Sequence, residues 1–315
     1  MTSPDLLAAE YEALNEACGL LDCSQRGKLA LSGPDRKVFL QGQVTNDIES
    51  LTPGHGCYAA FLTPKGKMLG DLRVLDSGSE LLLDTERIAL QGLFNMIRRF
   101  SIGYDVELHK RTVQYGLLSL IGPQSAPVAG AAKLGAQEHA HALVEVCGVA
   151  SRAVRTDVGI DLQCDAGDTE ALIAALARAG ARCVSRDAAE CVRIERGRPR
   201  YGIDLDNTVI PEEAGLNDRA VSFTKGCYVG QETVARLHYR GKPNRRLRGL
   251  LLSAQGASGD EVRLGERIVG ELRSTAVSPR LGPIALALIR REAPAGARVA
   301  VGADLSAEVV ELPFG

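Results

Sequence analysis

Lys225-Gly226-Cys227-Tyr228-Val229-Gly230-Gln231-Glu232 is the most informative stretch of the sequence. It places one thiol between glycines, beside a lysine and just before a helix-like run that ends at His238. A neighbouring ammonium group and the partial positive charge of a helix start both favour a thiolate. We therefore expect Cys227 to be exposed and reactive, with Lys225 lowering its pKa. The alternative interpretation is a structural cysteine in a turn.

The composition is that of an ordinary globular protein, with 45% hydrophobic and 24% charged residues in a chain of 315. This length allows two or three domains. The net charge of −2 excludes nucleic-acid binding by overall electrostatic attraction. No apolar run reaches the length of a membrane span, and the N-terminus lacks the pattern of a targeting segment. We therefore expect a cytoplasmic protein with no membrane partner.

The eight cysteines form no C-x-x-C pair, so neither a zinc ribbon nor a thioredoxin-like motif is predicted. A chain of this length without a signal peptide also argues against disulfides. Most of the cysteines, Cys147 and Cys191 among them, have the apolar neighbours of small buried residues. Only Cys227 and, less clearly, Cys57 lie in glycine-rich loop sequence.

Helical and strand-like hydrophobic periods alternate up to about residue 244, which is typical of an α+β fold. Asp168 and Asp187 stand at the starts of two expected helices and are candidate N-caps. Beyond residue 244 about six short strands follow one another, which predicts a small β-barrel over 245–315. The expected helices are 5–18, 90–100, 169–179 and 187–194, and the clearest expected hairpin joins 57–62 to 71–75.

The stretch at 225–231 resembles the motif of the YgfZ proteins, which are folate-binding relatives of the T-protein of the glycine cleavage system. The similarity continues, in order, over nearly the whole chain. The other matching stretches are Phe39-Leu-Gln-Gly-Gln-Val-Thr-Asn-Asp47, Phe61-Leu-Thr-Pro-Lys-Gly-Lys-Met68, the run from Arg193 to Asp204, Ile210-Pro-Glu-Glu-Ala-Gly-Leu216, the run from Ala235 to Arg246, and Leu312-Pro-Phe314.

This resemblance implies three domains around a central opening. The folate-binding region would span 1–244 as two intertwined α+β subdomains, approximately 1–105 with 155–244, and 106–154 plus neighbouring segments. A C-terminal β-barrel would follow over 245–315. The resemblance also implies a bound tetrahydrofolate or a derivative. The implied function is that of an accessory factor for assembly or repair of iron–sulfur proteins, including radical enzymes that thiolate tRNA, with Cys227 as the functional thiol.

Iron–sulfur clusters commonly need four protein ligands, so Cys227 cannot hold one alone. If Cys227 binds iron, the missing ligands must come from a carrier or client protein, from glutathione or from a second copy. We therefore expect a transient [2Fe–2S] cluster shared at an interface. Iron–sulfur carrier or client proteins are the expected partners, and direct tRNA binding is left open.

Several side chains are candidates for holding the folate. Glu195 stands where the T-protein relatives use a glutamate against the pterin ring, and one carboxylate can accept hydrogen bonds from adjacent N–H groups of a pterin. An ion pair with Arg193 or Arg196 is the alternative. The further candidates are Asn46 for lining the site or capping a turn, Tyr58, Phe61 and Tyr201 for stacking, and Gln231 for hydrogen bonding or helix capping.

The run 236–248 carries six basic side chains, beginning with Arg236 and Arg240. It predicts an anion site for the glutamate tail of a folate, a nucleic-acid backbone or an acidic partner. A solvated linker is the alternative.

Catalytic T-proteins carry an Asp-Asp pair where this chain has Gly70-Asp71. Aminomethyl transfer needs an acidic group near the reacting folate nitrogen. Asp71 can still serve, but the missing carboxylate favours an accessory factor over a tetrahydrofolate-dependent aminomethyl- or methyltransferase. An RNA-binding module is a third interpretation.

Overall fold

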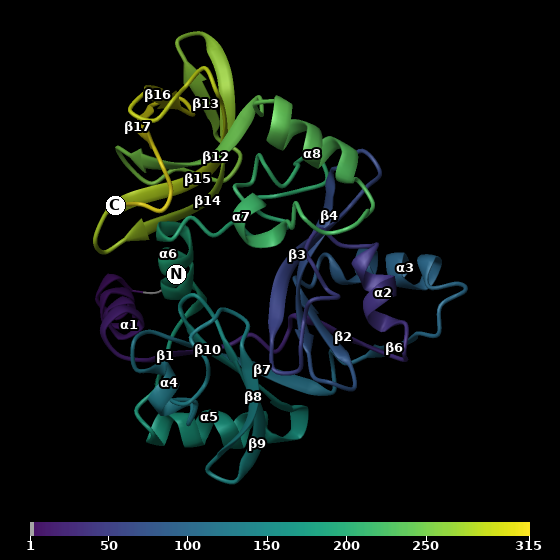
Figure 1. The fold of residues 1–315 in the computed structure, drawn as a ribbon. Helices are drawn as coiled ribbons and strands as arrows, with labels where there is room; N and C mark the ends of the chain where they lie inside the picture. Colours follow the sequence, from purple (N-terminus) through teal and green to yellow (C-terminus); the bar gives the residue numbers. More distant parts are fainter. Residues whose placement is uncertain (1–2) are drawn as a thin grey trace.

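The computed structural model describes residues 3–315, which form two β-sheets with packed helices and then a closed β-barrel (Figure 1). The barrel lies at the upper left of Figure 1, the six-stranded sheet at the bottom and the five-stranded sheet at the right. The mixed helix and strand content and the C-terminal barrel confirm the predicted α+β class.

The five-stranded sheet forms because its strands are apolar runs that become buried: residues 59–62 of one strand and Leu72, Val74 and Leu75 of the next are all buried. Phe39 and Leu40 of one helix and Leu93 and Ile97 of another cover one face and form a continuous core with the strands. The strands, in sheet order, are β3 (Gly56–Leu62), β4 (Met68–Asp76), β5 (Leu81–Thr85), β2 (Gly27–Ser32) and β6 (Glu107–Lys110), and the helices are α2 (Arg36–Gln41) and α3 (Leu90–Phe100).

The six-stranded sheet assembles segments that are distant in the sequence. Its edge strand, at residues 182–183, pairs in parallel with the strand at 19–22, and the other pairings are antiparallel. In sheet order the strands are β11 (Arg182–Cys183), β1 (Gly19–Asp22), β7 (Tyr115–Ile121), β10 (Gly159–Asp165), β9 (Val149–Arg155) and β8 (His141–Val146). The accompanying helical segments are α1 (Pro4–Glu16), α4 (Ser125–Val128), η1 (Ala166–Asp168), α5 (Thr169–Arg178) and α6 (Arg186–Glu195).

The start of α6 differs from the expectation. Ser185 is its N-cap, with an extended backbone and a side-chain oxygen that accepts from the N–H of Ala188 at 3.3 Å. Asp187 lies inside the first turn, so its assignment as the cap was wrong. Asp168 is the N-cap of α5, but its side chain makes no capping hydrogen bond.

The barrel has six strands, as the sequence predicts, and it shares a hydrophobic core with the five-stranded sheet. Leu62 and Met68 from the hairpin of β3 and β4 pack in one cluster with Leu247, Leu286 and Phe314 from the barrel domain. This common core fixes the barrel against the five-stranded sheet, the first sheet of the molecule. The strands, in order around the barrel, are β12 (Arg245–Leu252), β15 (Gly282–Arg290), β14 (Arg267–Ser278), β13 (Glu261–Leu264), β16 (Arg298–Val301) and β17 (Leu305–Val310).

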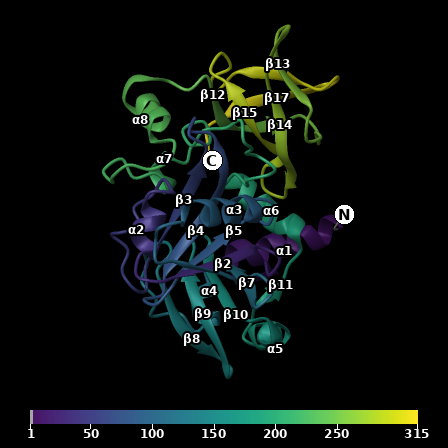
Figure 2. The same cartoon turned by 90° about the vertical axis from the view of Figure 1, so that its right-hand side faces the viewer.

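Two further helices, α7 (Asn217–Ala220) and α8 (Gln231–Arg240), precede the barrel. In Figures 1 and 2, α8 lies on the opposite side of the molecule from α1. Within residues 3–315, no helix combines the length and the apolar character that crossing a membrane requires.

Candidate functional site

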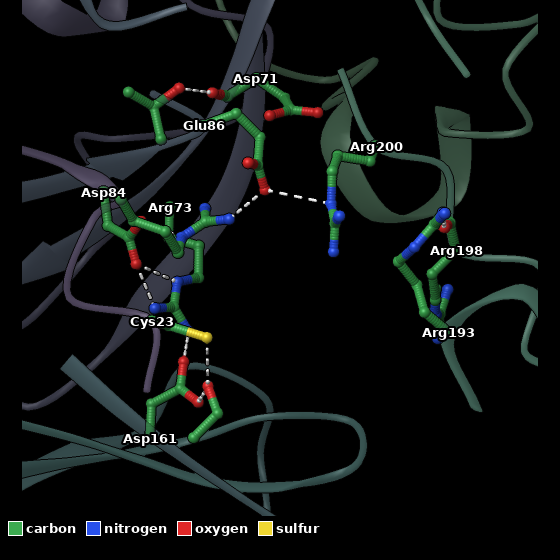
Figure 3. Close-up of polar contacts among 12 residues, drawn as sticks. Cys23, Asp71, Arg73, Asp84, Glu86, Asp161, Arg193, Arg198 and Arg200 are labelled. Atoms are coloured by element: carbon green, nitrogen blue, oxygen red, sulfur yellow. Dashed lines mark hydrogen bonds and ion pairs between the residues drawn. The ribbon is translucent and has the colours of Figure 1, made fainter. Parts of the chain in front are cut away.

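A cavity of about 280 Å³ opens where both sheets meet α6 and the loop that follows it. Tyr58, Asp71 and Arg73 reach it from β3 and β4, and Asp161 reaches it from β10. Figure 3 shows arginines of the segment 193–200 on one side and acidic residues of the first sheet on the other. We call this space the central cavity.

Asp71 and Tyr58 form a hydrogen-bonded pair in the central cavity, with the carboxyl group buried. The Tyr58 hydroxyl donates to Asp71 Oδ2 at 2.7 Å, and Asp71 is only 5% exposed. Burial raises the pKa of the Asp71 carboxyl to about 6, although the Tyr58 hydrogen bond and Arg26 oppose this shift. A carboxyl group with this pKa can take up or release a proton near neutral pH, which suits general acid–base catalysis.

The missing neighbour of Asp71 would not have reached the central cavity. Successive side chains of a strand point to opposite faces, so positions 70 and 71 cannot both face it. A Cβ atom at Gly70 would lie 2.6 Å from the Phe61 ring and 2.7 Å from Ala89 Cβ, inside the core of the first sheet. The cavity-facing member of the pair is thus present, so Gly70 does not count against a transferase.

A buried network of opposite charges forms one wall. Arg26 Nε contacts Asp84 Oδ1 at 2.7 Å, and Arg73 bridges Asp84 and Asp161, the latter at 2.5 Å. Burial acts to raise the pKa of Asp84, but Arg26 and Arg73 outweigh it and lower that pKa to about 2. The Asp84 carboxylate therefore stays ionised at pH values where Asp71 takes up a proton.

The opposite wall carries arginines from α6 and the loop after it. Arg193 contacts Glu190 Oε2 at 2.7 Å and Asp204 Oδ2 at 2.8 Å, which ties the helix to this loop. Arg200 contacts Glu190 and also reaches across to Glu86 Oε1 at 3.8 Å (Figure 3). The Arg200–Glu86 pair thus joins the two walls.

Two cavity-lining side chains keep buried polar atoms without a hydrogen-bond partner among residues 3–315: Nδ1 of His139 and Nε of Arg219. Burial, reinforced by Arg73 and Arg219, lowers the pKa of His139 to about 3, so its ring is neutral. The Arg219 guanidinium lies 5.4 Å from the centroid of the Tyr58 ring. Unpaired buried polar atoms are costly, and a polar ligand can satisfy them.

Cys23 is a cavity residue that the sequence reasoning missed. The Ser119 hydroxyl lies 3.6 Å from Cys23 Sγ and donates to Asp161 Oδ1 at 2.7 Å. Burial, followed by the charge of Asp161, raises the pKa of this thiol, so it is held protonated. The sequence did contain a signal for Cys23, because Cys23-Ser-Gln-Arg26 is a polar loop. Arg73 and Asp161 could have been noticed in the same way, because each is a charged residue within an apolar strand.

Lys225 anchors the loop that carries Cys227. Its Nζ donates to the carbonyl oxygens of Gln41, Val44 and Asn46 at 2.6, 2.8 and 2.7 Å. Burial lowers the pKa of Lys225 to about 8. The ammonium group is thus committed to main-chain acceptors, and its proposed effect on the thiol stays a prediction.

Cys227 itself is exposed, as the sequence predicts, and it lies four positions before Gln231, the first residue of α8. The loop packs on the β3–β4 hairpin, where a Cβ added to Gly230 would lie 2.6 Å from the Thr63 carbonyl oxygen. Gly230 has φ 85°, a left-handed conformation that glycine adopts without strain. Cys227 does not line the central cavity, so the thiol and the hollow are separate features.

Asn46 connects these two features. Its side-chain nitrogen donates to the main-chain carbonyl oxygen of Tyr58 at 2.8 Å, and its main-chain carbonyl oxygen accepts from Lys225 Nζ. The connection therefore runs from Lys225 through Asn46 to Tyr58 and on to Asp71. Asn46 does not line the central cavity, so of its two predicted roles the structure favours the local one.

Glu195 and Tyr201 also lie outside the lining. Glu195 is 7% exposed; the Tyr11 hydroxyl donates to its two oxygens at 2.8 and 3.0 Å, and Ser278 and Arg280 of the barrel domain contact it as well. Neither Arg193 nor Arg196 is its partner. Tyr201 donates weakly to the Met68 carbonyl at 3.4 Å and packs between two hydrophobic clusters.

The remaining candidates are dispersed. Gln231 begins α8, and Arg236 and Arg240 are exposed on that helix, none of them lining the central cavity. Phe61 is 1% exposed and belongs to the core of the first sheet. Cys147 is exposed, so the expectation of a buried residue was wrong.

Comparison with known proteins places the chain. The family model of the GCVT N-terminal domain matches residues 2–225, and that of the glycine cleavage T-protein C-terminal barrel domain matches residues 245–314. An aminomethyltransferase of Streptomyces avermitilis is 30% identical, with 97% of this chain and 88% of that protein covered. A chloroplastic protein of Arabidopsis thaliana, which is named as a transferase without a stated substrate, is 31% identical over 96% of this chain and 72% of its own length.

A solved T-protein structure has the same fold as this chain. The crystal structure of glycine cleavage system aminomethyltransferase T from Bartonella henselae superposes with a TM-score of 0.87 and 23% identity, covering all of this chain and 91% of that one. The resemblance to T-proteins seen in the sequence is therefore confirmed for fold and family, whereas the narrower YgfZ assignment is not decided by these matches. The chain belongs to the glycine cleavage T-protein family.

Proposed function

We propose that the protein binds a reduced folate in the central cavity and supports transfer of a one-carbon group, such as an aminomethyl or methyl group. The observation that carries this proposal is the buried Asp71 carboxyl, held by Tyr58 with a pKa of about 6. The relatives named aminomethyltransferase support the same class of reaction.

The residues of the central cavity fit such a ligand. A pterin ring presents adjacent N–H donors and acceptors, and the cavity offers the carboxyl of Asp71, the unpaired Nδ1 of His139 and the unpaired Nε of Arg219. Its volume of about 280 Å³ is near the lower end of ligand pockets. When bound, the reduced folate supplies the nitrogen that carries the one-carbon group.

The chain's own residues then handle the proton. Asp71, when ionised, accepts a proton from the reacting nitrogen, and Tyr58 holds the carboxylate in place. The neighbouring carboxylates Asp84 and Asp161 are committed to Arg26 and Arg73, so Asp71 is the acidic group left for this task.

A second candidate is the folate-binding accessory role in iron–sulfur protein assembly or repair. The specific observation in its favour is the exposure of Cys227 on an anchored loop outside the cavity, where a partner protein can reach the thiol. Cys227 supplies one ligand, so a shared [2Fe–2S] cluster would take its others from a carrier or client protein. In this role, folate bound in the central cavity would regulate the protein, and the Cys227 thiol would bind the cluster.

One experiment with two variants separates the candidates. The assays are consumption of 5,10-methylene-tetrahydrofolate by purified protein and recovery of iron–sulfur enzyme activity in a strain lacking this gene. For a transferase, Asp71→Asn lowers turnover about 10²- to 10⁴-fold, and Cys227→Ser leaves it unchanged. For an accessory factor, Cys227→Ser abolishes recovery while folate binding persists.

Cys147→Ser is the matched control, because it removes another exposed thiol, one that lies between β8 and β9 and outside the Cys227 loop. Absence of tetrahydrofolate binding by the wild-type protein, measured calorimetrically at millimolar concentration, would refute both candidates.

A further inference from the structure

A second pocket, of about 290 Å³, lies at one end of the β-barrel. We call it the barrel mouth. Its lining comes from the linker after α8, from the first half of β12, and from the end of β15 with the turn that follows it; it shares no residue with the central cavity. The lining residues are Lys242, Pro243, Arg246, Arg248, Ile289, Arg290, Arg291, Ala293 and Pro294.

The strand register explains why cations gather there. Arg246 is paired with Ile289 and Arg248 with Ala287, and these partners face the barrel interior. Residues opposite each other in antiparallel strands share a face, so both arginines continue the inward row that Leu250 begins. The inward row of β12 is thus apolar in the middle of the barrel and cationic at its end.

The charges of the barrel mouth are not balanced. Five cationic side chains line it, and the lining contains no carboxylate. Arg246 contacts Glu212 at 3.2 Å and Arg248 contacts Glu311 at 2.5 Å, both outside the lining. Lys242, Arg290 and Arg291 have no ion-pair partner in the part of the chain that the structure describes. In the central cavity, by contrast, the buried arginines Arg26, Arg73 and Arg193 are all paired with carboxylates.

From this imbalance we infer that the barrel mouth binds a small oligophosphate group, such as that of a polyphosphate or a nucleotide di- or triphosphate. Guanidinium groups match pairs of phosphate oxygens in a bidentate manner, and a lysine ammonium adds a point charge. The pocket is concave and small, which suits a compact polyanion better than an extended macromolecular backbone. Two of the five cations, Arg290 and Arg291, come from outside the basic run that the sequence indicates.

Calorimetric titration of the full chain with inorganic tripolyphosphate tests the inference. The variant Arg290→Gln/Arg291→Gln removes two cations that have no carboxylate partner, so its folding should be preserved, and an unchanged Tm checks this. We expect saturable binding by the wild-type protein and roughly tenfold or greater weakening in the variant, because hydrogen bonds to charged groups are individually strong. The control Arg263→Gln/Arg298→Gln removes the same charge from other barrel strands and should bind within about twofold of wild type.

Three results would overturn the inference. The first is equal weakening in both double variants, which would reflect net charge alone. The second is absence of saturable tripolyphosphate binding at 150 mM salt. The third is tighter binding of triglutamate than of tripolyphosphate, which would assign the pocket to carboxylates. A titration with ATP and with inorganic tripolyphosphate distinguishes a nucleotide from a polyphosphate source.

Discussion

The central cavity and the Cys227 loop both carry reactive groups, but they hold them by opposite means. In the central cavity, side chains from three parts of the fold are buried and neutralise one another, as the Arg26–Asp84–Arg73–Asp161 network shows. In the Cys227 loop, the thiol is exposed, and main-chain contacts made by Lys225 fix its position. The cavity is therefore suited to a small ligand that it desolvates, and the loop is suited to a partner that approaches from solvent.

The largest effect on stability should come from breaking the cavity network. Arg73→Met leaves Asp161 without its ion-pair partner and Asp84 with only Arg26. Removing one member of a buried ion pair typically costs about 3–5 kcal/mol. We expect a decrease of this size in the free energy of unfolding, measured by urea denaturation at pH 7.

The matched control is Arg263→Met, which breaks an exposed pair with Glu261. Exposed ion pairs contribute about 0–1 kcal/mol, so this variant should unfold almost like the wild type. Similar losses in the two variants would show that the cavity charges are as solvated as the surface ones.

Asp71 should have a smaller, pH-dependent effect of opposite sign. Its folded-state pKa of about 6 exceeds the ordinary value of 3.8, so its contribution to stability is complete at low pH and is lost as the pH rises through 6. The difference corresponds to about 3 kcal/mol of destabilisation when the carboxyl is ionised. Asp71→Asn should therefore stabilise the protein by up to about 3 kcal/mol at pH 8 and by almost nothing at pH 4.

Urea unfolding of wild type and Asp71→Asn across this pH range measures the effect. Asp76→Asn is a useful comparison, because Asp76 is also buried on β4 but is paired with Lys37 at 2.7 Å, so its loss should destabilise at pH 8. A stability difference between wild type and Asp71→Asn that does not change with pH would contradict the assigned pKa. If Asp71→Asn also loses turnover, Asp71 lowers the stability of the protein but is needed for its activity.

Much of the fold could be predicted because its signals are local. The β3–β4 hairpin, α8 and the six barrel strands follow from hydrophobic alternation and turn residues. Cys147 shows the limit: its apolar neighbours suggested burial, but Cys147 and Gly148 both have positive φ and form the turn between β8 and β9. A two-residue turn of this kind exposes its side chains whatever their character.

The candidate site was predictable only in part. Tyr58 and Asp71 were both named from the sequence and both line the central cavity, but Tyr58 was expected to stack on a ligand, and its hydrogen bond to Asp71 was not predicted. Arg73 and Asp161 could not be paired from sequence, because they lie on different sheets and their contact depends on how the sheets meet. Glu195 illustrates the same difficulty, since its partners Tyr11 and Ser278 come from the two ends of the chain.

Lys225 tests how firmly the thiol loop is held. Lys225→Met removes donors from three main-chain carbonyls, and net contributions of about 1 kcal/mol per hydrogen bond predict a loss of about 3 kcal/mol. Amide hydrogen exchange of residues 226–230 should be faster in this variant than in the wild type. Lys67→Met is the control, because Lys67 donates to a single carbonyl, that of Thr208, at 2.6 Å. Equal exchange rates in the two variants would show that the loop is held by other contacts.

The smallest effect on stability, and the sharpest contrast between the two regions, concerns the thiols. Cys227→Ser should change the free energy of unfolding by less than about 0.5 kcal/mol, because the side chain is exposed. Alkylation of the native protein at pH 7.5, read by mass spectrometry, should label Cys227 before Cys23 and Cys57. Burial raises the pKa of both of those thiols, that of Cys57 to about 12, so they lack the reactive thiolate. If a reduced folate fills the central cavity, it should slow alkylation of Cys23 further and leave Cys227 unaffected. Protection of Cys227 instead would mean that the ligand lies against the loop and that the two regions form one site.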